Sequence, residues 1–211
     1  MKNLENRLAY IFIFIAAVFF ILFAVYSEGD WGGADSMVHY RISRYAFKYP
    51  GLFLDLWGKP VFNILSAPFS QFGFLGLKFF NICVALLSSW IAYSLTRIMK
   101  WPVNYLAVPM VLFAPMYFII IPSGLTEPLF GLVLISAVWL FFKEEYVLSA
   151  VVISLLPFAR NEGFIIIPFF FLAFLSRKKY KPIPFLISGY VFFSLLGWLI
   201  FNDIFWISKH F

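Results

Sequence analysis

The sequence has few charged residues and a single cysteine, and both shortages restrict what the chain can be. Only 12% of its 211 residues are charged, whereas 63% are hydrophobic. This balance excludes an ordinary soluble domain. Cys83 has no second cysteine to pair with, which excludes an intrachain disulfide and a cysteine-based metal cage. Because Cys83 lies within an apolar run, we expect it to be a small packing residue.

Several motifs of soluble enzymes are also missing. We find no metal-ligand spacing, phosphate-binding glycine loop, Ser-His-Asp pattern, internal repeat or low-complexity linker. We therefore expect neither a metal nor a cofactor. The formal net charge of +6 does not indicate nucleic acid binding. The basic residues lie mostly at the ends of apolar runs, where they set membrane topology and contact anionic lipid.

Long apolar runs account for most of the chain. They cover residues 8–26, 74–96, 103–121, 127–142, 146–159, 163–176 and 183–201, with a shorter piece at 61–72. A spanning helix needs roughly 20 apolar residues, so the fifth and sixth runs are short, and Pro157 and Pro168 interrupt them. The first run is too long for a signal peptide and is expected to be retained. We predict an all-α fold, a polytopic transmembrane bundle of about seven helices in a single domain over 1–211.

Basic residues occupy alternate gaps between these runs. They are Lys2 and Arg7, then Arg97 and Lys100, then Lys143, and finally Arg177, Lys178, Lys179 and Lys181. The gap at 122–128 contains no lysine or arginine. The positive-inside rule places the basic gaps in the cytoplasm. We therefore predict a multi-pass cell-membrane protein with a cytoplasmic N-terminus and an outer loop at 27–60.

The outer loop carries most of the chemistry-bearing residues. Val38, Ile42, Tyr45 and Tyr49 recur at helical spacing, and Arg41, Arg44 and Lys48 recur on another face. This pattern predicts an amphipathic helix near 36–48 that lies on the membrane surface with its apolar face docked. Asp35 directly precedes it and is either its N-cap or a general base at the membrane face.

The remaining polar residues also have two interpretations each. His39 is a surface histidine or part of a site. Arg41 and Arg44 contact lipid headgroups or hold a phosphate. Lys59 snorkels or is a second phosphate ligand. Glu127 is stabilised by a helix N-terminus or belongs to the site. Arg160 and Glu162 are solvated turn residues, a mutual ion pair or the walls of an aqueous cavity.

The order of these motifs resembles a GT-C-type membrane glycosyltransferase of the polyprenyl-phosphate-sugar-dependent, mannosyltransferase-like kind. Four segments carry the resemblance: Asp35 within 33–36, the Trp-Gly-Lys-Pro stretch at 57–60, the Thr-Glu-Pro-Leu-Phe turn at 126–130 and the Arg-x-Glu-Gly at 160–163. The resemblance covers nearly the whole chain in order and topology. Family members are usually much longer, so we expect an N-terminal membrane half that a missing C-terminal half or a protein partner completes.

The resemblance implies sugar transfer from a polyprenyl-phosphate donor to an acceptor on the outer face. Asp35 would be the catalytic base, and His39, Arg41, Arg44, Lys59, Glu127, Arg160 and Glu162 would bind substrate. Membrane lipids would be the other partners. The alternative is a transporter-like protein or a non-catalytic multi-pass subunit, because charged residues between two proline-bearing half-helices are also typical of transport sites.

Overall fold

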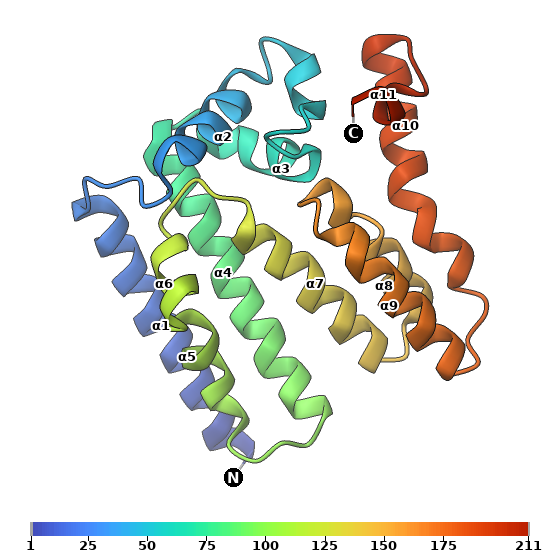
Figure 1. The fold of residues 1–211 in the computed structure, drawn as a ribbon. Helices are drawn as coiled ribbons and strands as arrows, with labels where there is room; N and C mark the ends of the chain where they lie inside the picture. The colour runs from blue at the N-terminus through green and yellow to red at the C-terminus, as the bar shows by residue number, and fades with distance from the viewer. Residues whose placement is uncertain (1, 211) are drawn as a thin grey trace.

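A computed structural model describes residues 2–210, and every regular element in that part of the chain is a helix (Figure 1). Three segments are long and apolar enough to cross a membrane. They are α1 (Lys2–Tyr26), α4 (Gly73–Ile98), and the 3₁₀ helix η4 (Ile183–Ile187) continued by α10 (Ser188–Phe201). The chain therefore has the helix lengths and composition of a membrane protein.

The other elements are shorter. Three further apolar segments are α7 (Glu127–Phe142), α8 (Tyr146–Ile153) with η3 (Leu156–Phe158), and α9 (Gly163–Ser176). Beside α1 and α4 run η2 (Asn104–Leu106), α5 (Ala107–Leu112) and α6 (Pro115–Ile120). The first loop folds into α2 (Gly33–Tyr45), η1 (Pro50–Leu54) and α3 (Pro60–Ser70), and α11 (Trp206–His210) follows α10. Figure 1 shows α2, η1 and α3 lying across one end of the bundle.

The two ends of the bundle differ in composition. One end, here the basic end, holds the start of α1 and the ends of α4, α7 and α9 (Figure 1). Tyr93 near the end of α4 donates a hydrogen bond to Asn6 of α1, and Lys179 lies over the ring of Tyr146. The first contact joins the end of α4 to the start of α1, and the second joins the basic gap after α9 to the start of α8. The opposite end, here the loop end, carries α2 and α3.

Helix α4 separates two apolar clusters. On one side it packs against α1, whose small residues Ala9, Ala16 and Ala24 are buried beside Phe20. Small side chains let the backbones of membrane helices approach closely. On its other side α4 packs against α3 and α7, and this second cluster extends to α8, α9 and α10. The fold thus holds α7 and the loop before it against a well-buried central helix.

Proline and cysteine positions correct three sequence-based expectations. The run at 103–121 is not one helix, because Pro115 has no amide hydrogen and its predecessor Ala114 is extended at ψ 127°. Pro168, in contrast, lies inside a continuous α9, whereas Pro157 falls in the 3₁₀ turn that follows α8. Cys83 is exposed rather than buried in packing, because it lies on the same side of α4 as the exposed Leu87.

The first-loop helix differs from its prediction in bounds and in orientation. It starts at Gly33 with Gly32 as its cap, so Asp35 lies in its first turn and is not the N-cap. Its buried residues are Ser36, His39 and Ser43, and Ser43 shares a 2.7 Å hydrogen bond with Ser66 of α3. The expected docking residues Val38 and Tyr45 are 38% and 52% exposed.

The reason for this orientation is space. Helix α2 packs closely on α3 and on the loop before α7, and only small or hydrogen-bonding side chains fit there. Of the periodic apolar residues, Ile42 is half-buried beside Gly58, whereas Val38 and Tyr45 lie on the side away from the core. The helix ends before Lys48, which lies in the following turn.

Candidate functional site

Charged residues from three distant segments meet at the loop end. Arg160 bridges two carboxylates, with Nη1 2.5 Å from Glu127 Oε1 and Nη2 2.8 Å from Glu162 Oε1. Next to Arg160 in sequence, Asn161 Oδ1 accepts a 2.8 Å hydrogen bond from Lys59 Nζ. These five residues are the charged cluster. They come from the start of α3, the start of α7 and the turn between η3 and α9, so only the tertiary fold brings them together.

The position of Lys59 depends on an unusual backbone conformation. Lys59 has φ +67° and ψ 117° and directly precedes Pro60, the first residue of α3. Non-glycine residues seldom adopt positive φ, and such strain is concentrated at functional sites. The turn is held by Asp55, whose Oδ1 accepts a hydrogen bond from the Gly58 amide, and by Asn63, whose Nδ2 donates to the Asp55 carbonyl.

The loop before α7 is fixed by α2. Gly124 donates its amide hydrogen to Ser36 Oγ, and its carbonyl accepts from His39 Nδ1, both at 3.0 Å. Because a carbonyl only accepts, His39 Nδ1 must carry a proton. A β-carbon at Gly124 would lie 2.6 Å from the Ser36 carbonyl oxygen, so only glycine allows this close approach. These contacts place Glu127 three residues further on.

The same loop is also fixed by α4. Asn81 is fully buried in the middle of the structure, and its Nδ2 donates to the carbonyls of Ser123 at 2.8 Å and Leu125 at 3.0 Å. A buried amide side chain in an apolar helix is favourable where it hydrogen-bonds backbone groups that would otherwise have no partner. Asn81 therefore anchors the loop that begins α7.

Burial and neighbouring charges shift the pKa values of the charged cluster. Burial lowers the pKa of Lys59, and the nearby Arg160 lowers it further, while Glu162 and Asp55 partly oppose the shift. The hydrogen bond from Arg160 lowers the pKa of Glu162. The hydrogen bond to Glu162 raises the pKa of Arg160, and Glu127 adds to that effect. Arg160 is thus a permanent cation held by two carboxylates.

His39 links the cluster to Asp35. Burial lowers the pKa of His39 from its ordinary value of 6.5, while the hydrogen bond to Gly124 and the charges of Asp35 and Glu127 oppose the shift. Both carboxylates are therefore close enough to His39 to act on it electrostatically. Asp35 itself is exposed in the first turn of α2.

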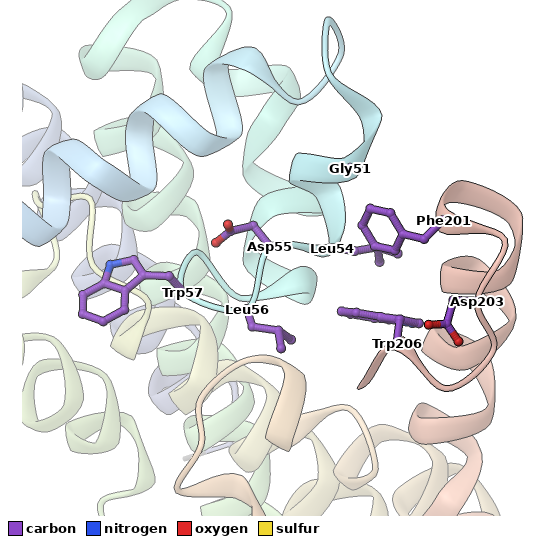
Figure 2. A pocket seen from close by; sticks show the side chains of 8 residues that line it. All are labelled: Gly51, Leu54, Asp55, Leu56, Trp57, Phe201, Asp203 and Trp206. Atoms are coloured by element: carbon purple, nitrogen blue, oxygen red, sulfur yellow. The ribbon is translucent and has the colours of Figure 1, made fainter. Parts of the chain in front are cut away.

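A cavity of about 520 Å³ opens on the other side of the turn that precedes Lys59 (Figure 2). It lies between the η1–α3 loop and the end of the chain, and is lined by Gly51, Leu54, Asp55, Leu56, Trp57, Phe201, Asp203 and Trp206. Figure 2 shows Phe201 and Trp206 extending toward Leu54 and Leu56. Trp206 is fixed, because its Nε1 donates to the Phe193 carbonyl at 2.8 Å. Asp55 lines the cavity, and its negative charge also acts on Lys59 of the cluster.

Besides His39, two predicted binding residues lie outside the cluster, Arg41 and Arg44. Arg44 donates to the carbonyls of Ser70, at 3.0 Å, and Gln71, at the end of α3. A cation there also stabilises the negative end of the helix dipole. Arg41 is exposed on α2. For both residues, substrate binding stays a prediction.

Asp55, Asn81 and Asn161 were not predicted from the sequence as site residues. Asn81 could have been noticed, because a polar residue within an apolar run at membrane depth is usually functional. Asp55 and Asn161 carry no such signal, since both lie in turns where polar residues are common. Within the described residues, no group of three or more His, Cys, Asp and Glu is arranged to hold a metal ion.

Comparisons of the chain with protein-family models, curated proteins and solved structures give no match. The chemistry and geometry of the residues are therefore the basis for the functional hypothesis below.

Proposed function

We propose that the chain is the membrane part of a glycosyltransferase that takes a sugar from a polyprenyl-phosphate donor. The observation that carries the proposal is the charged cluster at the loop end, which adjoins both an open cavity and a bundle of apolar helices. The phosphate of such a donor suits the charged cluster, its sugar suits the cavity, and its lipid tail suits the apolar helices. Apolar helices with one polar site at their end are thus a suitable host for this substrate class.

The proposal includes a multi-pass topology. In it, seven segments pass through the membrane: α1, α4, α5–α6, α7, α8–η3, α9 and η4–α10. The basic end is cytoplasmic, because lysine and arginine are enriched in cytoplasmic loops, and the loop end faces outward. The cluster and cavity then lie at the outer interface, where a polyprenyl tail can remain in lipid.

In this mechanism Asp35 accepts the proton of the acceptor hydroxyl as the new glycosidic bond forms. The bond between the anomeric carbon and the donor phosphate breaks, and the phosphate leaves with the electron pair. Lys59 and Arg160 are the cations of the cluster and would stabilise that negative charge. Glu127 and Glu162 hold the Arg160 guanidinium in place, and His39 positions the loop before Glu127.

The cavity supplies a place for a sugar. Phe201 and Leu56 offer apolar surface, and Asp55 offers a carboxylate that can accept hydrogen bonds from hydroxyl groups. Small-molecule sites usually combine apolar walls with a few polar groups in this way.

The test is transfer by the protein in lipid nanodiscs, using radiolabelled polyprenyl-phosphate sugars and a panel of hydroxyl acceptors. Asp35→Asn keeps the shape and removes the proton acceptor, so we expect transfer to fall by about 10²–10⁴-fold. Glu28→Gln, at an exposed carboxylate of the same loop, is the matched control and should keep full activity.

Equal activity of Asp35→Asn and the wild type would remove Asp35 as the base. The absence of transfer by the wild type from every donor would contradict the proposed activity. A transporter-like protein or a non-catalytic multi-pass subunit would then explain the fold better.

A further inference from the structure

A second cavity lies at the basic end, far from the charged cluster. It has a volume of about 390 Å³ and lies between the ends of α4 and α7. Helix α4 contributes Trp90, Ser94, Arg97 and Ile98, and α7 contributes Trp139 and Lys143. Two tryptophans and two cations from separate helices thus converge on one opening.

The two cations face this cavity without a carboxylate in its lining. Lys143 Nζ lies 3.9 Å from the centre of the Trp139 ring, and the Arg97 guanidinium lies 5.7 Å from that of Tyr93. A cation over an aromatic face is attracted by the ring. Arg97 also hydrogen-bonds Tyr93, but a guanidinium has five N–H donors and so has others left for a ligand. Within residues 2–210, the cations that form ion pairs with carboxylates are Arg160 and Lys209, so Arg97 and Lys143 are not among them.

Three acidic residues at this end of the bundle line other cavities and not this one. Glu144 and Glu145 follow Lys143 but line a different cavity with residues 178–182. Glu5 lines a third cavity with Arg97, and its Oε2 accepts a hydrogen bond from Asn104 at 3.1 Å. The opening between Arg97 and Lys143 is therefore electropositive and suited to an anion.

An exposed apolar stripe leads from the cavity along α4. Cys83, Leu87 and Trp90 lie on one helix face at spacings of four and three residues. Leu87 is 46% exposed and Trp90 37% exposed, so this face of α4 is only partly covered by other helices. Trp90 and Trp139 lie with ring centroids 6.5 Å apart at the junction of the stripe and the cations, and tryptophan is the residue typical of the headgroup layer.

We infer that this cavity binds an anionic phospholipid. Its phosphate lies between Arg97 and Lys143, which donate charge-assisted hydrogen bonds to the phosphate oxygens. One acyl chain follows the stripe of Cys83, Leu87 and Trp90. The site is independent of the proposed sugar transfer, because it lies at the opposite end of the bundle and shares no residue with the charged cluster.

The test measures binding of phosphatidylglycerol to the protein in phosphatidylcholine nanodiscs, by native mass spectrometry. The double variant Arg97→Gln and Lys143→Gln should bind phosphatidylglycerol about tenfold or more weakly, since it loses two charge-assisted contacts. The matched control is Arg177→Gln and Lys181→Gln, which removes two cations from the same end but from outside the cavity lining. It should bind as the wild type does.

A second measurement keeps the test valid if the double variant does not fold. Phosphatidylglycerol with brominated acyl chains should quench Trp90 and Trp139 more strongly than brominated phosphatidylcholine does. Replacing both, Trp90→Phe with Trp139→Phe, should remove the difference between the two lipids. Trp198→Phe, at a 54% exposed tryptophan of α10, should leave the difference intact. Equal binding by both double variants, equal quenching by both lipids, or displacement of phosphatidylglycerol by inorganic phosphate at similar concentration would each overturn the inference.

Discussion

Asn81 offers the most direct test of how the fold positions the site. The substitution Asn81→Leu keeps a side chain of similar size in α4 and removes both donors to the Ser123 and Leu125 carbonyls. A hydrogen bond contributes about 0.5–1.5 kcal/mol to stability, so losing two costs about 1–3 kcal/mol. The low end is expected if these bonds resemble those measured between membrane helices, at about 0.6 kcal/mol each. The buried Asn81 Oδ1 has no partner, which offsets part of the loss.

The assay is thermal unfolding in detergent followed by circular dichroism. For a chain of this length about 1 kcal/mol corresponds to roughly 2–4 °C, so Asn81→Leu should lower Tm by about 2–12 °C. The control is Ser89→Ala in the same helix. Ser89 is also fully buried, but its hydroxyl bonds only to the Leu86 carbonyl one turn earlier. A bond of that kind contributes little to stability.

The loss of sugar transfer by Asn81→Leu should exceed what its lower stability alone would cause. Asn81→Leu releases the loop that begins α7 and thus the carboxylate of Glu127, so transfer should fall even well below Tm. If Asn81→Leu and Ser89→Ala lower Tm equally, the anchoring role of Asn81 is refuted.

Three further predictions concern α2, pH and topology. Ser43→Leu should destabilise the protein by about 1–3 kcal/mol, because the leucine side chain does not fit against α3. Val38→Asp should change Tm little in detergent. If Val38→Asp destabilises the protein more than Ser43→Leu does, α2 docks through the apolar face that the sequence predicted. Because burial lowers the folded-state pKa of His39, the unfolded chain binds more protons just below pH 6.5, so Tm should fall as pH drops from 7 to 5. His39→Gln should flatten that slope, and an unchanged slope would exclude His39 as its source. In a Cys83→Ser background, an impermeant thiol reagent applied outside should label a cysteine at position 33 and spare one at 179; the opposite labelling would invert the proposed topology.

The elements of this fold could largely be predicted from hydrophobic patterning. Run length and composition depend only on local sequence, so α7 and α9 were expected at residues 127–142 and 163–176, where the structure places them. The break before Pro115 was missed, because proline is tolerated in some membrane helices, as Pro168 is in α9, and only the surrounding packing decides which ones bend.

The faces of the helices could not be predicted in the same way. The apolar period of α2 indicated Val38 and Tyr45 as the docking side, yet the helix packs through Ser36, His39 and Ser43. When the surroundings include lipid, an apolar face no longer identifies the protein interior. Close approach of backbones and hydrogen bonding then determine which side of a helix is buried.

The sequence by itself determined that the chain is all-helical and largely apolar, because these properties follow from composition and spacing. It also indicated Lys59, Glu127, Arg160 and Glu162 as neighbours of the same membrane face. The ion pair of Arg160 and Glu162 was one interpretation of the sequence, and the structure contains it. Only the tertiary structure decided that Arg160 also pairs with Glu127 and that Asn161 accepts a hydrogen bond from Lys59. The physical reason is that such contacts depend on how α3, α7 and α9 pack around one another, and packing geometry at this scale is not encoded in the pattern of any single segment.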